Sequence, residues 1–148
     1  DAAITVMIGQ AQPEIQKLVI TTREVLDIAV AECRPGRYWS EIAGKMQSHA
    51  ERTGFSVVRD YVGHGIGRKM HEDPKIPNFV SDELLQNDFM LRKGMILAVE
   101  PMVNMGTSRV KVLSDGWTVV TADHKPSAHF EHTLAITDCG AEVLTESE

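Results

Sequence analysis

The chain has 148 residues, 43% of them hydrophobic, which is enough for one domain with its own core. Its 15 Lys and Arg against 21 Asp and Glu give a formal net charge of -6, so we expect no nucleic-acid or anionic-membrane partner. The two cysteines, Cys33 and Cys139, are too few for a disulfide framework; both are expected to be buried thiols in a reducing compartment, which favours the cytoplasm.

A strand and two helices are predicted in the first part of the chain. Residues 2–8 are apolar and β-branched, which indicates a strand, and they lack the cationic region of a signal peptide and the length of a membrane span. Apolar residues then recur at helical spacing from Glu14 to about Glu32. Ser40 is the expected N-cap of a second helix that ends near Thr53 and Gly54.

The rest of the chain is predicted to consist mainly of antiparallel strands. The expected strands cover residues 55–58, 95–99, 110–113, 117–120, 129–137 and 142–145. Asp115 and Gly116 form the turn signal of a hairpin. Residues 59–93 are rich in glycine and proline and are predicted to be a long functional loop. Helices first and antiparallel strands later indicate an α+β domain.

Four side chains form a candidate metal site: Asp1, His64, Glu100 and Glu131. One imidazole and three carboxylates suit one or two divalent ions that activate water, so we expect hydrolytic chemistry. The glycines around His64 let the backbone approach a ligand and leave the imidazole unobstructed. Glu100 ends an apolar strand, where a carboxylate is costly to bury unless it is paired or coordinated.

Each candidate also has a simpler explanation when it is taken alone. His64 fits a hydrogen-bonded histidine in a tight turn, and Glu131 fits a glutamate on the exposed face of a strand. His71 can donate a hydrogen bond to a developing oxyanion, but it also fits a loop histidine paired with an adjacent acid. Two acids at strand positions make coordination the stronger interpretation.

Four runs of sequence carry a family resemblance: residues 60–74, 94–102, 115–119 and 130–133. In this order and spacing they closely resemble the C-terminal half of the bacterial-type (type I) methionine aminopeptidases, which have the pita-bread fold. The resemblance extends from Asp1 to about Leu144. The GHGxG element is shared across the fold, but the longer run YVGHGIGRxxHEDPxxPN is much more specific.

The resemblance implies a metal-dependent aminopeptidase that removes the N-terminal methionine from peptides and nascent chains by means of metal-activated water. It implies two divalent ions per complete site, of Co, Mn, Fe or Zn. Asp1, His64, Glu100 and Glu131 would be the metal ligands, with Asp1 and Glu131 bridging the ions. Glu100 would also relay a proton to the leaving amine.

The same resemblance assigns three residues to the substrate. His71 would contact the scissile peptide and stabilise the tetrahedral intermediate. Trp117 would form a wall of the pocket for the methionine side chain. Met70 stands where the family often has an aromatic residue. His129 stands where a glutamine is common, and it is expected to add an imidazole beside the metal ligands.

Residues 1–148 are therefore expected to be a single catalytic domain that is incomplete at the N-terminus. Another metal-ligand aspartate and a substrate-contacting histidine of the family lie before the position of Asp1. The chain would supply chiefly the second half of the fold, two helices packed on a curved antiparallel sheet. Alone it would bind a single metal ion weakly and expose the inner face of its sheet, and so associate with the missing N-terminal half or another chain.

Two other functions remain open at this point. The first is a non-catalytic pita-bread module that binds a protein or the ribosome; relatives of that kind tend to lose the metal ligands, whereas all four expected here are present. The second is an Xaa-Pro dipeptidase of the same fold, whose motifs diverge around the GHGxG loop. A comparison of Met-Ala and Ala-Pro substrates separates the two peptidases.

Overall fold

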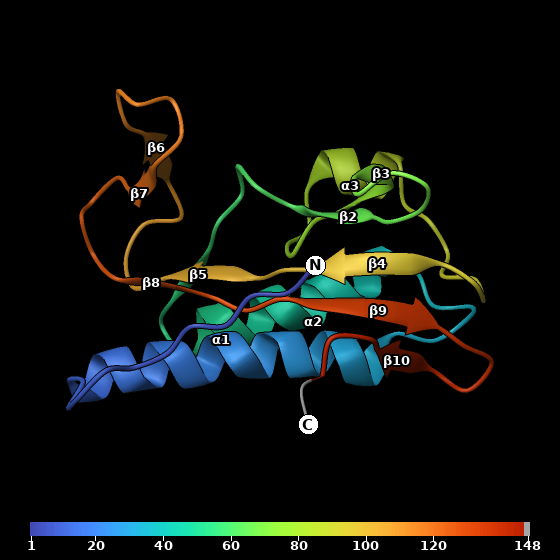
Figure 1. Ribbon diagram of the computed structural model, residues 1–148, viewed down its shortest axis with the longest axis horizontal. Helices are drawn as coiled ribbons and strands as arrows, with labels where there is room; N and C mark the ends of the chain where they lie inside the picture. The colour runs from blue at the N-terminus through green and yellow to red at the C-terminus, as the bar shows by residue number, and fades with distance from the viewer. Residues whose placement is uncertain (147–148) are drawn as a thin grey trace.

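Helices α1 (Pro13–Glu32) and α2 (Trp39–Arg52) pack against each other and against the sheets in the computed structural model, which describes residues 1–146 (Figure 1). The predicted first helix is confirmed. Pro13 stands in its first turn, where its fixed φ suits the helix and its missing N–H is not needed. No helix in the described part of the chain is both long and apolar enough to cross a bilayer.

The start of α2 differs from the prediction. The N-cap is Tyr38, so Ser40 lies inside the first turn. The backbone N–H of Ser40 donates to Asp88 Oδ1 at 3.1 Å, and its hydroxyl donates to Asp88 Oδ2 at 2.5 Å. A carboxylate 48 residues further along the chain thus satisfies the free N–H at this helix start, which a local capping rule could not foresee.

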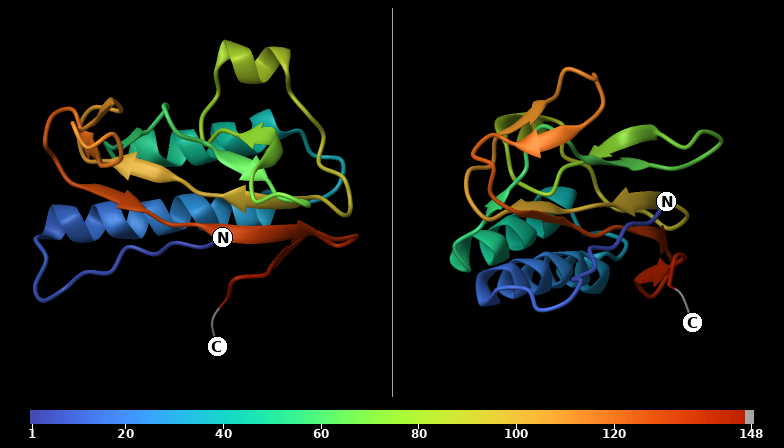
Figure 2. Two further views of the ribbon diagram at one scale, coloured as in Figure 1. Left: turned by 45° about the horizontal axis from the view of Figure 1, so that its top comes forward. Right: turned by 60° about the vertical axis from the view of Figure 1, so that its left-hand side comes forward.

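Two antiparallel sheets form the main body. The larger has the strand order β10–β9–β4–β2–β3, made of Ala141–Val143, His132–Ile136, Ile96–Val99, Gly63–Gly65 and Glu72–Ile76. The smaller has the order β1–β5–β8, made of Ser56–Val57, Met102–Asn104 and Ser127–His129. The predicted hairpin is confirmed as β6 (Val110–Val112) and β7 (Val119–Thr121), and the right-hand view of Figure 2 shows it apart from the helices.

The core lies between the helices and the sheets. Its largest fully buried side chains include Trp39, Leu18, Leu26, Ile42, Met46, Leu97 and Leu134. These come from one face of each helix and from the helix-facing positions of β4 and β9, as the spacing of apolar residues requires. The helices thereby hold the sheet from one side.

The prediction of a long loop over residues 59–93 is wrong. The segment contains strands β2 and β3 and the short helix α3 (Asp82–Gln86). The glycines that suggested a loop are needed inside the sheet. A Cβ on Gly63 would overlap the Ala98 carbonyl of β4, and one on Gly65 would overlap the Asp73 carbonyl of β3. Here glycine permits close approach of neighbouring backbones rather than marking a turn.

Two smaller expectations are also wrong. Residues 2–8 form no strand; they pair only through an isolated bridge between Ala3 and Glu131, and Ile8 is 94% exposed. Cys33 is buried as expected, but Cys139 is exposed beyond the end of β9. An apolar run becomes a strand only where a partner strand is present, and residues 2–8 have no backbone pairing beyond Ala3.

Candidate metal centre

The two internal glutamates of the predicted site lie where the chain crosses from one sheet to the other. Glu100 follows β4 of the large sheet and precedes β5 of the small one. Glu131 lies between β8 of the small sheet and β9 of the large one, which is why the predicted strand 129–137 is interrupted. Since β4 pairs with β9 and β5 with β8, the two crossings are adjacent, and the carboxylates converge.

His64 reaches the same place from β2, whose register sets it opposite Ala98 of β4. Its Nε2 lies 3.7 Å from Glu100 Oε1 and 3.9 Å from Asp1 Oδ2. Its Nδ1 lies 3.1 Å from the Gly65 carbonyl oxygen. Because a carbonyl can only accept, this contact assigns the proton to Nδ1 and leaves the Nε2 lone pair facing the carboxylates.

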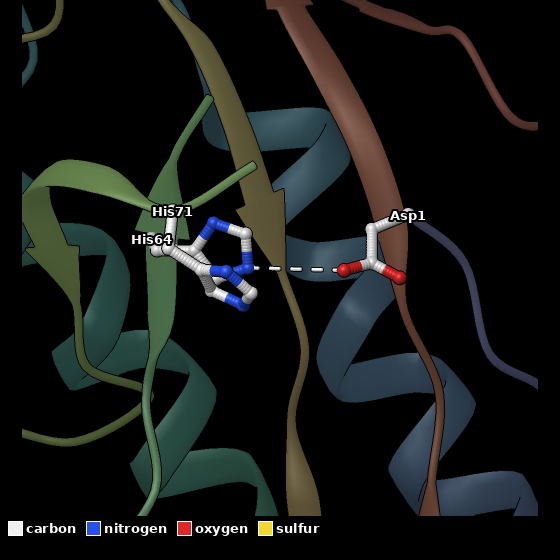
Figure 3. A group of neighbouring side chains, drawn as sticks. All are labelled: Asp1, His64 and His71. Atoms are coloured by element: carbon white, nitrogen blue, oxygen red, sulfur yellow. Dashed lines mark ion pairs between the residues drawn. The ribbon is translucent and has the colours of Figure 1, made fainter. Parts of the chain in front are cut away.

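The potential ligand atoms form two groups that share His64. One group contains Asp1, His64 and His71, and the other contains His64, Glu100 and Glu131; in each, the ligand atoms lie within 4.8 Å of one another. Figure 3 shows the Asp1 carboxylate facing the two imidazoles across the sheet. The structure therefore brings together all four residues predicted as metal ligands, together with His71.

The electrostatics of the glutamates favour a cation. Burial, and then the neighbouring Glu131, raise the pKa of Glu100 to about 7. Burial also raises the pKa of Glu131, whose side chain is 6% exposed and whose Oε1 has no hydrogen-bond partner among the residues that the structure describes. An unpartnered buried carboxylate is costly, and a divalent ion offers the missing partner. A site of three carboxylates and imidazole nitrogen fits such an ion.

Of the three residues predicted to contact the substrate, only His71 lies against one of the candidate metal ligands. His71 precedes β3, and its ring centroid lies 4.1 Å from that of His64 with a 47° tilt. Met70, beside it in the chain, is 56% exposed. Trp117 lies in the β6–β7 hairpin and is 87% exposed. That hairpin stands away from β2 and β3 (Figure 1). Its strands β6 and β7 line one pocket together with Glu100, but Trp117 is not among the lining residues.

Two further residues position the ligands and carry no role in the sequence analysis. The fully buried Asn78 donates from Nδ2 to the Glu100 carbonyl oxygen at 3.2 Å. Thr133 donates its hydroxyl to the Asp1 carbonyl oxygen at 2.7 Å. Each bond fixes the backbone of a candidate ligand. The sequence offered one signal for each residue: Asn78 is a polar residue inside the longest family motif, and Thr133 is a polar residue in the mostly apolar strand β9.

Residues 1–138 match metallopeptidase family M24. The chain belongs to this family. A methionine aminopeptidase of Clostridium perfringens is 50% identical over 145 residues, which cover 98% of this chain and 57% of that protein. Methionine aminopeptidase 1 of Bacillus subtilis is 46% identical over the same shares of the two chains. The chain thus spans little more than half the length of these M24 relatives.

Solved structures of related proteins confirm the predicted pita-bread fold. The methionine aminopeptidase of Thermotoga maritima superposes with a TM-score of 0.93 at 48% identity, covering 99% of this chain and 57% of that one. The prolidase of Pyrococcus horikoshii superposes with a TM-score of 0.73 at 20% identity, covering 99% of this chain and 36% of that one. The second likeness concerns the fold alone. The resemblance to methionine aminopeptidases is confirmed.

Proposed function

We propose that the chain acts in a metal-dependent aminopeptidase that removes the N-terminal methionine from peptides and nascent proteins. The M24 relatives with 46% to 50% identity, which are named methionine aminopeptidases, support this reaction. The observation that carries it is the buried Glu131 carboxylate, unpartnered at Oε1 and converging with Glu100 on the lone pair of His64. A non-catalytic binding module would carry the free-energy cost of burying these carboxylates without needing a metal there.

Asp1, His64, Glu100 and Glu131 would hold the metal. A divalent ion bound there supplies Lewis-acid polarisation of the scissile carbonyl and lowers the pKa of water into the neutral range. The protein's part is to fix the ligands: the crossings between the two sheets place the glutamates, and the hydrogen bond to Gly65 sets the tautomer of His64.

Glu100 and His71 would act on the substrate. Glu100, which would also hold the ion, would accept a proton from water and return it to the leaving amine. The exposed His71, packed on the ring of His64, would donate a hydrogen bond to the oxygen that becomes negative when the peptide carbonyl is attacked.

The side chain of the substrate would meet Met70, which neighbours His71 in the chain. Trp117 would reach it only if the hairpin or another element completes the pocket, because the structure leaves this indole 87% exposed. The ions would be Co, Mn, Fe or Zn, two in a complete site, in the cytoplasm. This chain alone would bind one ion weakly, and two ions per chain would contradict that expectation.

Association with another polypeptide would cover apolar side chains near the N-terminus. Ile4, Val6 and Ile8 are 72%, 67% and 94% exposed. Exposed apolar side chains that gather on one surface mark interaction sites, and these three would contribute to such a surface. Sedimentation at several protein concentrations would test this, and a monomer at all of them would contradict it.

The test of the function is release of methionine from Met-Ala-Ser by this chain in Co(II) or Mn(II), with Ala-Pro as the competing substrate. We expect methionine release that Glu131→Ala abolishes. Isothermal titration with Co(II) on the same samples measures metal binding separately from peptide hydrolysis. Preference for Ala-Pro would support a dipeptidase. Metal binding without release from either peptide would mean either that the N-terminal half of the fold is essential for turnover or that the protein only binds.

A further inference from the structure

His129 lies beside the candidate metal centre without being one of its predicted ligands. It ends β8 and pairs with Met102, so it lies across from the Glu100 crossing. Its Nδ1 is 3.2 Å from the Pro101 carbonyl oxygen, and its Nε2 is 4.0 Å from Glu131 Oε2. Its side chain is 34% exposed, whereas that of Glu131 is 6% exposed. The imidazole is therefore more open to solvent than the carboxylate beside it.

The contact with Pro101 determines which nitrogen carries the proton. A carbonyl oxygen only accepts, so Nδ1 is the donor, and in the neutral imidazole Nε2 carries a lone pair. Histidines that bind metals characteristically donate their other N–H to a backbone carbonyl or a carboxylate. His64 has the same arrangement, with Nδ1 on the Gly65 carbonyl and Nε2 facing two carboxylates.

The distance from His129 to Glu131 excludes a direct hydrogen bond. At 4.0 Å the two atoms are beyond hydrogen-bonding range, and each presents a lone pair to the other. Two donors that each lie about 2.1 Å from one ion are at most about 4.2 Å apart. The separations of His64 from Asp1 and Glu100, 3.9 and 3.7 Å, fall in the same range. A cation between the two groups removes the unfavourable contact.

We propose that His129 Nε2 is an additional ligand of the divalent ion held by Glu131. This inference rests on the proposed function, since it needs a metal at that carboxylate. A second imidazole makes the site richer in nitrogen, which favours Co(II) and Zn(II) over Mn(II). The family often has a glutamine at this position, so His129→Gln is the matched replacement.

The experiment is proton NMR of the Co(II)-loaded chain, in which each ligating imidazole contributes one strongly shifted, solvent-exchangeable N–H signal. We expect His129→Gln to remove one such signal and to raise the Co(II) dissociation constant at least about tenfold. His132→Gln is the control; the His132 ring contacts Thr145, and its loss should remove no shifted signal.

A second measurement needs no variant and so does not depend on the folding of His129→Gln. In the wild-type chain labelled with ¹⁵N-histidine, Zn(II) should move the Nε2 resonance of His129 from the position of a free lone pair to that of a metal-bound nitrogen. The inference fails if His129→Gln keeps every shifted signal, or if Zn(II) leaves the Nε2 resonance of His129 unmoved. In either case the proposed function still stands. A wild-type chain that binds neither ion overturns the proposed function as well.

Discussion

His71 packs its imidazole against that of His64, with ring centroids 4.1 Å apart, yet it is exposed while His64 is not. The pair places His64 toward Glu100 and Asp1, and in the proposed function the exposed His71 would face the substrate. We expect His71→Ala to lower kcat for Met-Ala-Ser by about 10²- to 10³-fold, the usual loss for one oxyanion donor.

The Co(II) dissociation constant should stay within about threefold in His71→Ala, because a residue that only binds the oxyanion adds nothing to metal affinity. Isothermal titration measures this directly. The exposed His124, on the segment after β7, gives the control His124→Ala. A tenfold weaker affinity would instead make His71 a metal ligand, as its place in a group with Asp1 and His64 allows.

Glu131→Gln should separate stability from metal binding. Removing a buried, unpartnered charge should raise the melting temperature of the metal-free chain by about 2–5 °C. The same variant should lose the stabilisation that Co(II) gives the wild type. Thermal unfolding in EDTA and in Co(II) tests both effects. The exposed Glu142 of β10 supplies the control Glu142→Gln, for which we expect neither change.

The raised pKa of Glu100 predicts a pH dependence of stability in EDTA. Below pH 4.5 the group is protonated in both folded and unfolded chains. As the pH rises, the unfolded chain loses this proton first, while the folded chain keeps it up to about pH 7. Stability contributed by the protonated group is therefore lost across this interval.

Urea unfolding of the wild type and Glu100→Gln over that interval measures the effect. The free energy of unfolding of the wild type, relative to the variant, should fall by about 2–3 kcal/mol from pH 4.5 to pH 7.5. A difference that stays flat or rises with pH would show that Glu100 ionises freely in the folded chain.

Two glycines provide a matched pair for the close approach of β2 to its neighbours. Gly63→Ala should lower the free energy of unfolding by about 3 kcal/mol or more, because the added Cβ meets the Ala98 carbonyl. Gly44 lies inside α2, and a Cβ there is 3.5 Å from Val80 Cγ2, an ordinary contact. Gly44→Ala should be neutral or stabilising by up to about 1 kcal/mol. Urea unfolding followed by circular dichroism compares them.

Local patterns predicted the first helix and the hairpin well, and the glycine-rich segment and the strand over residues 2–8 poorly. The spacing of apolar residues located α1 because helix periodicity is a property of neighbouring residues. The Asp115–Gly116 turn located the hairpin for the same reason. The run around Gly63 and Gly65 was interpreted as a loop, because glycine signals a turn unless a neighbouring strand is known to lie against it.

The sequence by itself determined the family, the α+β class and the identity of the candidate ligands, because these depend on residue type and spacing along one chain. Only the tertiary structure decided how they meet. The pairing of β4 with β9 and of β5 with β8 brings Glu100 and Glu131 together, and β2 adds His64. The backbone carbonyl beside His129 and the exposure of Trp117 also depend on strand pairing across distant segments, which sequence spacing does not encode.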